Sequence, residues 1–275
     1  MIAILLATYN SERYLSEQID SILHQTYTDW KLYIRDDGSK DGTVDVIRQY
    51  VANHPDKIEQ ISDQEAGKGA YGNFITLLGA VDADYYMFCD HDDYWSPTKI
   101  EVSFERMKQL EAVHPGVPIV VHTDMKVVDQ DLNVLSESFW KYSRLLPDHT
   151  SFWELVCCNT VNGCTMLFNK QAKLVSVGNE PFCLMHDTLV SQSVAAVGGV
   201  ISAVKEPTML YRQHGDNVVG AADAKRSYFL RQMDHLSTTV RHNDEVWKRA
   251  SHIKKASRAY FYFTKMKISL IRFFR

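Results

Sequence analysis

Phe88-Cys89-Asp90-His91-Asp92-Asp93-Tyr94-Trp95 is the stretch that most constrains the fold, because three carboxylates directly follow the apolar run Tyr85 to Phe88. Pro97 and a helical pattern come next, which places the acids at the carboxyl end of a strand, where open α/β sheets bind ligands. Carboxylates this close repel one another, and a hard divalent cation would keep them ionised. Mg²⁺ or Mn²⁺ bound this way leaves room for phosphate oxygens, so a diphosphate-bearing substrate is the first hypothesis. An acidic surface loop is the alternative.

Two βα units precede the acidic run. Ile2 to Leu6 is a continuous apolar stretch typical of a buried parallel strand, and Lys31 to Ile34 is the second predicted strand. The apolar positions after each strand recur at helical spacing: Leu15, Ile19, Ile22 and Leu23 after the first, and Val44, Ile47 and Val51 after the second. A weaker third unit combines Ile58 to Ile61 with Phe74 to Val81. Repeated units of this kind predict an α/β fold with a doubly wound, parallel sheet.

The order of elements changes after Val117. Ile119 to His122, Lys126 to Val128 and Cys164 to Phe168 are predicted strands, separated by an irregular stretch rich in Trp, Tyr and Ser. We expect this half of the chain to shape substrate specificity. Beyond Ala221 the composition becomes helical.

The charge of the 275-residue chain is divided unevenly. Residues 225–275 contain 13 Lys and Arg but 3 Asp and Glu, which leaves 17 basic and 31 acidic residues for the rest. The tail therefore carries about +10 and the body about −14, which predicts contact of the tail with an anionic surface such as a membrane. The alternative is an amphipathic helix that packs on the domain or on a second subunit. Nucleic acid is not expected as a partner, because the acidic body would oppose it.

Cysteine usage and the N-terminus indicate a cytoplasmic protein. The five cysteines are an odd number in mostly apolar surroundings without Cys-x-x-Cys spacing, which favours reduced core thiols. Met1 to Leu6 lacks a basic leader, and no apolar run reaches the length of a membrane span. We therefore expect a cytoplasmic enzyme, with peripheral attachment to the inner face of the cell membrane as a role for the tail.

Three motifs together resemble the family 2 inverting glycosyltransferases of the GT-A fold. They are Ala7-Thr8-Tyr9-Asn10, the run Asp36 to Thr43, and Asp90 to Asp93, in the family's order and spacing. The late run Tyr211 to Gly220 is similar to the rhamnosyltransferase subset, which builds bacterial cell-surface polysaccharides. The resemblance implies a Rossmann-like, mostly parallel central sheet with flanking helices over residues 1–220. Residues 1–116 would form the nucleotide-binding half, 117–220 the acceptor-binding half, and 221–275 a basic helical appendage.

The resemblance also implies roles for the residues at the strand ends. Thr8, Tyr9 and Asn10 would contact the nucleotide, with Tyr9 stacked on its base, and Asp37 beside Asp36 would accept a hydrogen bond from a pyrimidine ring N–H. Asp90 matches the ribose ligand and Asp92 the metal ligand. Asp36 to Ser39 also favours a type I turn with a helix cap, and the two interpretations are compatible. Asp93 is predicted to cap the following helix.

Two later segments would complete the site. Asp187, after His186, matches the family's catalytic base, and an N-cap is its alternative role. His214 is similar to a late-loop histidine that completes the metal shell or contacts the diphosphate, and Arg212 would assist it. Gly215 and Gly220 bracket His214, which favours a loop that orders over the bound donor.

The run Gly67-Lys68-Gly69-Ala70-Tyr71-Gly72 formally fits the dinucleotide fingerprint G-x-G-x-x-G. It follows the third predicted strand rather than the first, and no suitably placed acid follows as a ribose ligand, so the fingerprint is rejected. The resemblance places this run close to the diphosphate, and Lys68 becomes a candidate phosphate contact.

The expected activity is metal-dependent, inverting sugar transfer with Mn²⁺ or Mg²⁺. The donor would be a nucleotide-diphosphate sugar, with dTDP-rhamnose favoured, and the acceptor a glycan or a lipid-linked saccharide. One alternative is a nucleotidyltransferase that makes the activated sugar, but Thr8 to Ser11 lacks the Gly-rich basic loop that triphosphate requires. The other is a non-catalytic nucleotide-sugar-binding subunit, against which the acid at Asp187 argues.

Overall fold

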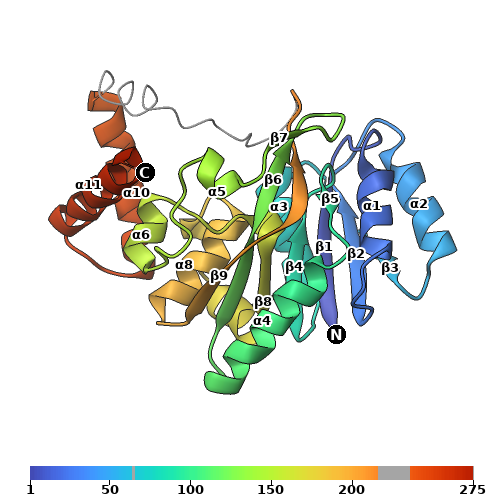
Figure 1. Cartoon of the computed structure of the whole chain (residues 1–275), viewed down its shortest axis with the longest axis horizontal. Helices are drawn as coiled ribbons and strands as arrows, with labels where there is room; N and C mark the ends of the chain where they lie inside the picture. Colours follow the sequence, from blue (N-terminus) through green and yellow to red (C-terminus); the bar gives the residue numbers. More distant parts are fainter. Residues whose placement is uncertain (64–65, 216–235, 275) are drawn as a thin grey trace.

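A nine-stranded sheet organises the described part of the chain, which is residues 1–63, 66–215 and 236–274 of a computed structural model (Figure 1). The end of the late motif, 216–220, and the start of the predicted tail, 221–235, lie outside the described residues. The strands are β1 (Ile2–Thr8), β2 (Trp30–Asp36), β3 (Ile58–Gln60), β4 (Tyr85–Cys89), β5 (Tyr94–Trp95), β6 (Ile119–Val128), β7 (Val134–Ser136), β8 (Met166–Asn169) and β9 (Val200–Arg212).

Helices surround this sheet and follow most of its strands. They are α1 (Leu15–Leu23), α2 (Thr43–Asn53), α3 (Gly69–Ala80), α4 (Lys99–Val113), α5 (Phe139–Tyr142), α6 (Phe152–Cys157), α7 (Lys170–Ser176), α8 (His186–Ala196), α10 (Leu236–Ile253) and α11 (Arg258–Phe274), with single 3₁₀ turns η1 (Gly163–Thr165) and η2 (Glu180–Phe182).

The first half is the parallel, doubly wound sheet that the βα units predict. Strands run in the order β3-β2-β1-β4 and all four are parallel. Alternate residues of β1 point to opposite faces, as the period of a strand requires. Ile2, Ile4 and Leu6 pack with α1, α2 and α4, whereas Ala3, Leu5 and Ala7 pack with α3, α7 and α8.

The second half adds mixed pairing. β8 joins β4 and β6 and is antiparallel to both, so that β6 runs in the direction of β4, and β9 is parallel to β6. The two predicted strands Ile119 to His122 and Lys126 to Val128 are one strand, β6, whose pairing with β9 shifts register near Asp124. β9 itself was not predicted, because Lys205-Glu206-Pro207 interrupts its apolar pattern. The strand predicted over Cys164 to Phe168 begins at Met166, since η1 precedes it.

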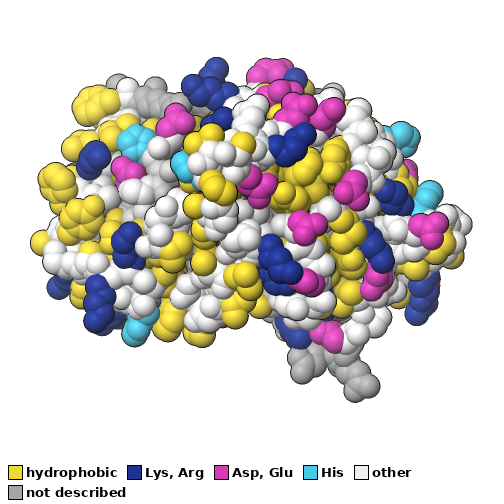
Figure 2. All heavy atoms as spheres, turned by 90° about the horizontal axis from the view of Figure 1, so that it is seen from below, with side chains coloured by type: hydrophobic (Ala, Val, Ile, Leu, Met, Phe, Trp, Pro, Cys, Tyr) yellow, Lys and Arg dark blue, Asp and Glu magenta, His cyan; other side chains and the backbone are white. Residues whose placement is uncertain are grey.

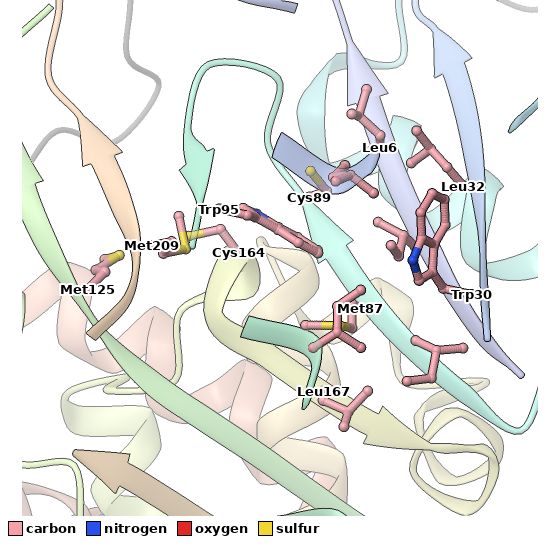
Figure 3. Close-up of a cluster of buried hydrophobic side chains, with 14 of the residues drawn as sticks. Leu6, Trp30, Leu32, Met87, Cys89, Trp95, Met125, Cys164, Leu167 and Met209 are labelled. Atoms are coloured by element: carbon pink, nitrogen blue, oxygen red, sulfur yellow. The ribbon is translucent and has the colours of Figure 1, made fainter. Parts of the chain in front are cut away.

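A sulfur-rich part of the core lies below the acidic run (Figure 3). Trp95, Cys164 and Met209 lie next to one another in this view, each at most 4% exposed. Lys99 is also fully buried, and its Nζ lies 4.9 Å from the centroid of the Trp95 ring. Desolvation lowers the pKa of Lys99 to about 8. The acidic run therefore lies next to tightly packed, buried apolar side chains.

The C-terminal helices pack on α6. Phe152, Trp153, Ala250 and Phe261 form a separate buried cluster, in which the rings of Trp153 and Phe261 meet edge to face at 5.9 Å. Figure 1 shows α10 and α11 together at the end of the molecule beside α6. Among the described helices, none is both long and apolar enough to cross a bilayer.

Two phenylalanines of α11 test this packing. Phe261 is fully buried, whereas Phe263 is 61% exposed. We expect Phe261→Ala to lower the free energy of unfolding by about 3 kcal/mol, because it leaves a cavity against α6. The matched change Phe263→Ala should stay within about 0.5 kcal/mol of the natural chain. Urea unfolding followed by circular dichroism measures both, and equal losses would contradict this arrangement of α11.

Candidate active site

The topology brings the ends of β1, β2, β4 and β9 and the start of β8 to the same edge of the sheet. β1, β2 and β4 are parallel, with Thr8 opposite Asp36 and Leu6 opposite Cys89. β9 runs in the same direction, so its end at Arg212 lies at this edge, which is uppermost in Figure 1. β8 runs the opposite way, which brings its start and the preceding turn η1 to the edge as well. Ligand sites of open α/β sheets occur at such an edge.

The end of β1 is tied to the end of β2. The buried Thr8 hydroxyl donates to Asp36 Oδ1 at 3.0 Å, and Asp36 Oδ2 accepts the backbone N–H groups of Gly38 and Ser39 at 3.0 and 2.8 Å. Asp36 thus stabilises the turn after β2, in agreement with the turn predicted over Asp36 to Ser39. Asn10 Oδ1 accepts from the backbone of Lys40 at 2.9 Å. The Tyr9 ring, 53% exposed, stays open to solvent above this joint.

Asp37 is a buried carboxylate with three donors. Arg35 Nη1 donates to its Oδ1 at 3.0 Å, as does the backbone N–H of Lys68 at 3.1 Å, and the N–H of Gly69 donates to its Oδ2 at 2.8 Å. The glycine-rich run Gly67 to Gly72, which only formally fits the dinucleotide fingerprint, therefore binds the carboxylate of Asp37 through its backbone N–H groups. A carboxylate has about four lone-pair positions, so Oδ2 retains one for a further donor. Lys68 Nζ donates to Asp63 and Thr76, both at 3.1 Å.

In the acidic run Asp92 and Asp93 are buried and Asp90 is half-buried, and their carboxylates repel one another. Burial, followed by the charges of Asp92 and Asp187, raises the pKa of Asp90 to about 7. Burial, followed by the charges of Asp92 and Asp90, also raises the pKa of Asp93 well above its usual range. Asp90, Asp93 and Cys164 place three potential metal-ligand atoms within 4.8 Å of one another. The site thus concentrates negative charge that a cation would stabilise.

Asp93 does not cap the following helix, contrary to the sequence-based prediction. Thr98 is the N-cap residue of α4, and Asp93 Oδ1 instead accepts the backbone N–H of Arg212 at 3.2 Å. Its Oδ2 is buried without a hydrogen-bond partner among the described residues. The side chain is buried because Trp95 continues the strand pairing with β9, which turns the acid inward.

Asp92 and His214 face each other across the site. Asp92 Oδ2 lies 2.8 Å from His214 Nε2, and both side chains are at most 10% exposed. Arg212 holds the two segments together: its Nε donates to the carbonyl of Asp92 at 2.8 Å, its Nη1 to that of Gln130 at 2.6 Å, and its Nη2 pairs with Glu17. These contacts make Arg212 a tie between β9, the acidic run and α1. A phosphate contact by Arg212 stays a prediction.

Asp187 enters the site from the first turn of α8. Burial raises its pKa to about 6, against the opposing effect of backbone N–H groups, one of which belongs to Thr188 at 2.6 Å. The N-cap position of α8 is Met185, so Asp187 does not take that role. Its charge acts on Asp90, which places the two carboxylates in one site.

His186 is a packing residue. Its ring lies on Phe74 with centroids 3.9 Å apart and meets Phe88 at 4.7 Å. Desolvation lowers its pKa to about 3, so the ring is neutral. A Cβ on Gly163 would approach His186 Nε2 to 2.2 Å, so only glycine fits beside the ring. His186 therefore gives the site an uncharged wall next to Asp187.

Sequence reasoning missed four residues of the site: Glu17, Arg35, Gly163 and Cys164. Arg35 had a visible signal, since it is a cation at the end of an apolar strand directly before two acids. The other three contribute through contacts distant in sequence, for which the chain carries no local signal.

Known proteins are similar to this chain in sequence. The model of Glycosyl transferase family 2 matches residues 3–170. An uncharacterized glycosyltransferase of a Nostoc species is 28% identical over 81% of this chain and 68% of its own length. A dTDP-rhamnosyl transferase of Shigella flexneri is 27% identical over 78% of this chain and 74% of its own.

Two solved structures share the fold. Staphylococcus aureus TarS, in complex with UDP-GlcNAc, aligns with a TM-score of 0.63 at 14% identity, over 99% of this chain and 72% of the other. A mannosyltransferase of Pyrobaculum calidifontis, in complex with GDP-Man and Mn²⁺, aligns with a TM-score of 0.61 at 13% identity, over 98% and 73%. The predicted GT-A fold is confirmed. Because the family model spans more than half of the sequence, the chain belongs to glycosyl transferase family 2 and is a glycosyltransferase.

Proposed function

We propose that this enzyme transfers a sugar with inversion from a nucleotide-diphosphate donor to a glycan or lipid-linked saccharide in bacterial cell-surface polysaccharide synthesis. The observation that carries the proposal is the meeting of Asp90, Asp92, Asp187 and His214 at the edge of the sheet where Thr8 and Asp36 also lie. Transfer of an activated sugar requires both groups that bind the diphosphate and a base that takes the proton of the acceptor hydroxyl.

The nucleotide would lie across the ends of β1 and β2. Tyr9 is exposed and free to stack on a base, and Asp37 Oδ2 retains a lone pair for the N–H of a pyrimidine. Uracil and thymine both offer that donor. Thr8 and Asp36 would hold the loop in place, Asn10 would line it, and Lys68, which also pairs with Asp63, would contact phosphate.

The residues at the end of the acidic run fit a divalent cation. Asp92 Oδ2 and His214 Nε2 are 2.8 Å apart, and neighbouring ligands of an octahedral ion with bonds of about 2.1 Å lie about 3 Å from each other. A carboxylate with an imidazole suits Mn²⁺ better than Mg²⁺. When bound, the cation would neutralise the diphosphate as it leaves. Asp90 would then be free to hold the ribose.

Asp187 would act as the base. In an inverting transfer the acceptor oxygen bonds to the anomeric carbon while the bond from that carbon to the diphosphate oxygen breaks, and the acceptor proton must go to a base on the opposite face. A carboxylate whose pKa is about 6 is ionised at neutral pH yet basic enough to take this proton. Neutral His186 beside it would not compete for the proton.

The donor sugar is the finer part of the proposal. The Shigella relative is named a dTDP-rhamnosyl transferase, and the late Tyr211 to Gly220 motif resembles that subset. We infer that dTDP-rhamnose is the donor.

Replacement of the base provides the primary test. Asp187→Asn should lower the transfer rate roughly 100-fold or more while the donor dissociation constant changes little, because the proton acceptor is lost but the diphosphate grip is kept. Transfer of labelled rhamnose measures the rate. Asp84→Asn, an exposed acid at the opposite edge of the sheet, is the matched control. A well-folded Asp187→Asn enzyme with full activity would remove Asp187 from the mechanism.

The pH dependence offers a second test. Because the base works only when ionised, kcat/KM should rise with pH below about 6 and level off above it. A bound cation would move this midpoint down. Initial rates across buffers of constant ionic strength measure the profile. A rate that falls as pH rises from 5 to 7 would contradict a carboxylate base.

The donor and cation can be tested without turnover. Mn²⁺ with dTDP-rhamnose should raise the melting temperature more than UDP- or GDP-sugars do, since a ligand that binds the folded state stabilises it. Chelation of the metal or the change Asp92→Ala should remove most of the shift. If UDP-sugars give the largest shift, the rhamnose assignment is wrong although the site stands.

A further inference from the structure

Helix α11 is apolar on two opposite faces. Phe261, Thr264 and Ile268 are buried against the body of the protein. The other face carries five large apolar side chains, each more than half exposed: Tyr260, Phe263, Met266, Leu270 and Phe274. Their spacing of three or four residues places them in one stripe along the whole helix. We call this set the outer stripe.

A second apolar feature joins the outer stripe near the chain's end. Leu270 and Phe274 also line a hollow between α11 and the loop before α6, together with Ile271, Leu146 and Pro147. Asp148 and His149 also line this hollow, so the outer stripe continues into a concave, mostly apolar surface. Exposed apolar surface of this extent usually marks an interaction site.

Exposed basic side chains occur on both C-terminal helices. The sequence of α11 contains no Asp or Glu, and Lys267 is 53% exposed, with its Nζ 3.6 Å from Glu154 of α6. Lys254 and Lys255, just before α11, and Lys248 and Arg249 on α10 are also exposed. Over residues 236–274 there are nine Lys and Arg against two Asp and Glu. Figure 2 shows hydrophobic side chains projecting at the end of the molecule that these helices form, with Lys and Arg among them.

We propose that the outer stripe lies in the interface of a bilayer that contains anionic lipid, with the exposed lysines and arginines of the C-terminal helices on the headgroups. Apolar side chains inserted at the acyl boundary and cations facing anionic lipid are the two contributions that bind an interfacial helix. A second copy of this chain fits less well, because a symmetric contact would bring two positive surfaces together. The inference does not depend on the donor, and it would bring a lipid-linked acceptor to the enzyme.

Vesicle sedimentation of the full chain tests the proposal. The chain should bind phosphatidylcholine vesicles that contain phosphatidylglycerol, and bind more weakly to phosphatidylcholine alone or at high salt. The double change Phe263→Ser with Leu270→Ser should weaken binding by roughly tenfold or more, because two apolar side chains no longer enter the lipid.

The matched control is Leu135→Ser with Leu174→Ser, two exposed leucines on β7 and α7. It should bind vesicles as the natural chain does. Melting curves establish that all variants are folded, and transfer to a soluble acceptor should not change in either variant, which separates this test from that of the proposed function. Absence of binding to anionic vesicles would overturn the proposal, as would a dimer in solution that the outer-stripe change dissociates without any vesicle binding.

Discussion

Mutual repulsion among buried and half-buried carboxylates is the constraint on which the site depends. Asp90, Asp92, Asp93 and Asp187 converge where the sheet presents the ends of β4 and β9, and burial raises the pKa of three of them. A protein interior tolerates such a group only with compensating charge or protonation. Lys99 supplies part of the positive charge from the protein itself, and the backbone N–H of Arg212 donates to Asp93. The remaining negative charge can be offset by a bound cation. Because such a cation would also bind phosphate oxygens, the fold suits a diphosphate substrate.

The rest of the structure holds this cluster in place. Arg212 connects β9 to the acidic run and to α1, and His214 two residues later contacts Asp92 directly. Arg35 does the same for Asp37 on the other side of the site. His186 packs between Phe74 and Phe88 and fixes the first turn of α8, from which Asp187 projects. A buried neighbouring side chain therefore helps to position each of these site residues, in addition to the loop that carries it.

The parts predicted from sequence are those with local signals. The apolar run Ile2 to Leu6 and the helical spacing after it gave the parallel half correctly, and the acids after Phe88 marked the ligand edge. The failures have a common cause. β9 was missed because Lys205-Glu206-Pro207 breaks its apolar pattern, and Asp93 was taken for a cap because its partner, the backbone of Arg212, is distant in sequence. Tertiary contacts of this kind leave no periodicity to detect.

We propose that Asp92 and His214 would together hold one cation against the donor's diphosphate. A crystal structure with Mn²⁺ and dTDP, recorded at a wavelength where manganese scatters anomalously, tests it most directly. We expect one anomalous peak next to both Asp92 Oδ2 and His214 Nε2, beside the bound diphosphate. A peak held instead by Asp93 and Cys164, or a bound nucleotide with no metal beside Asp92, would contradict it.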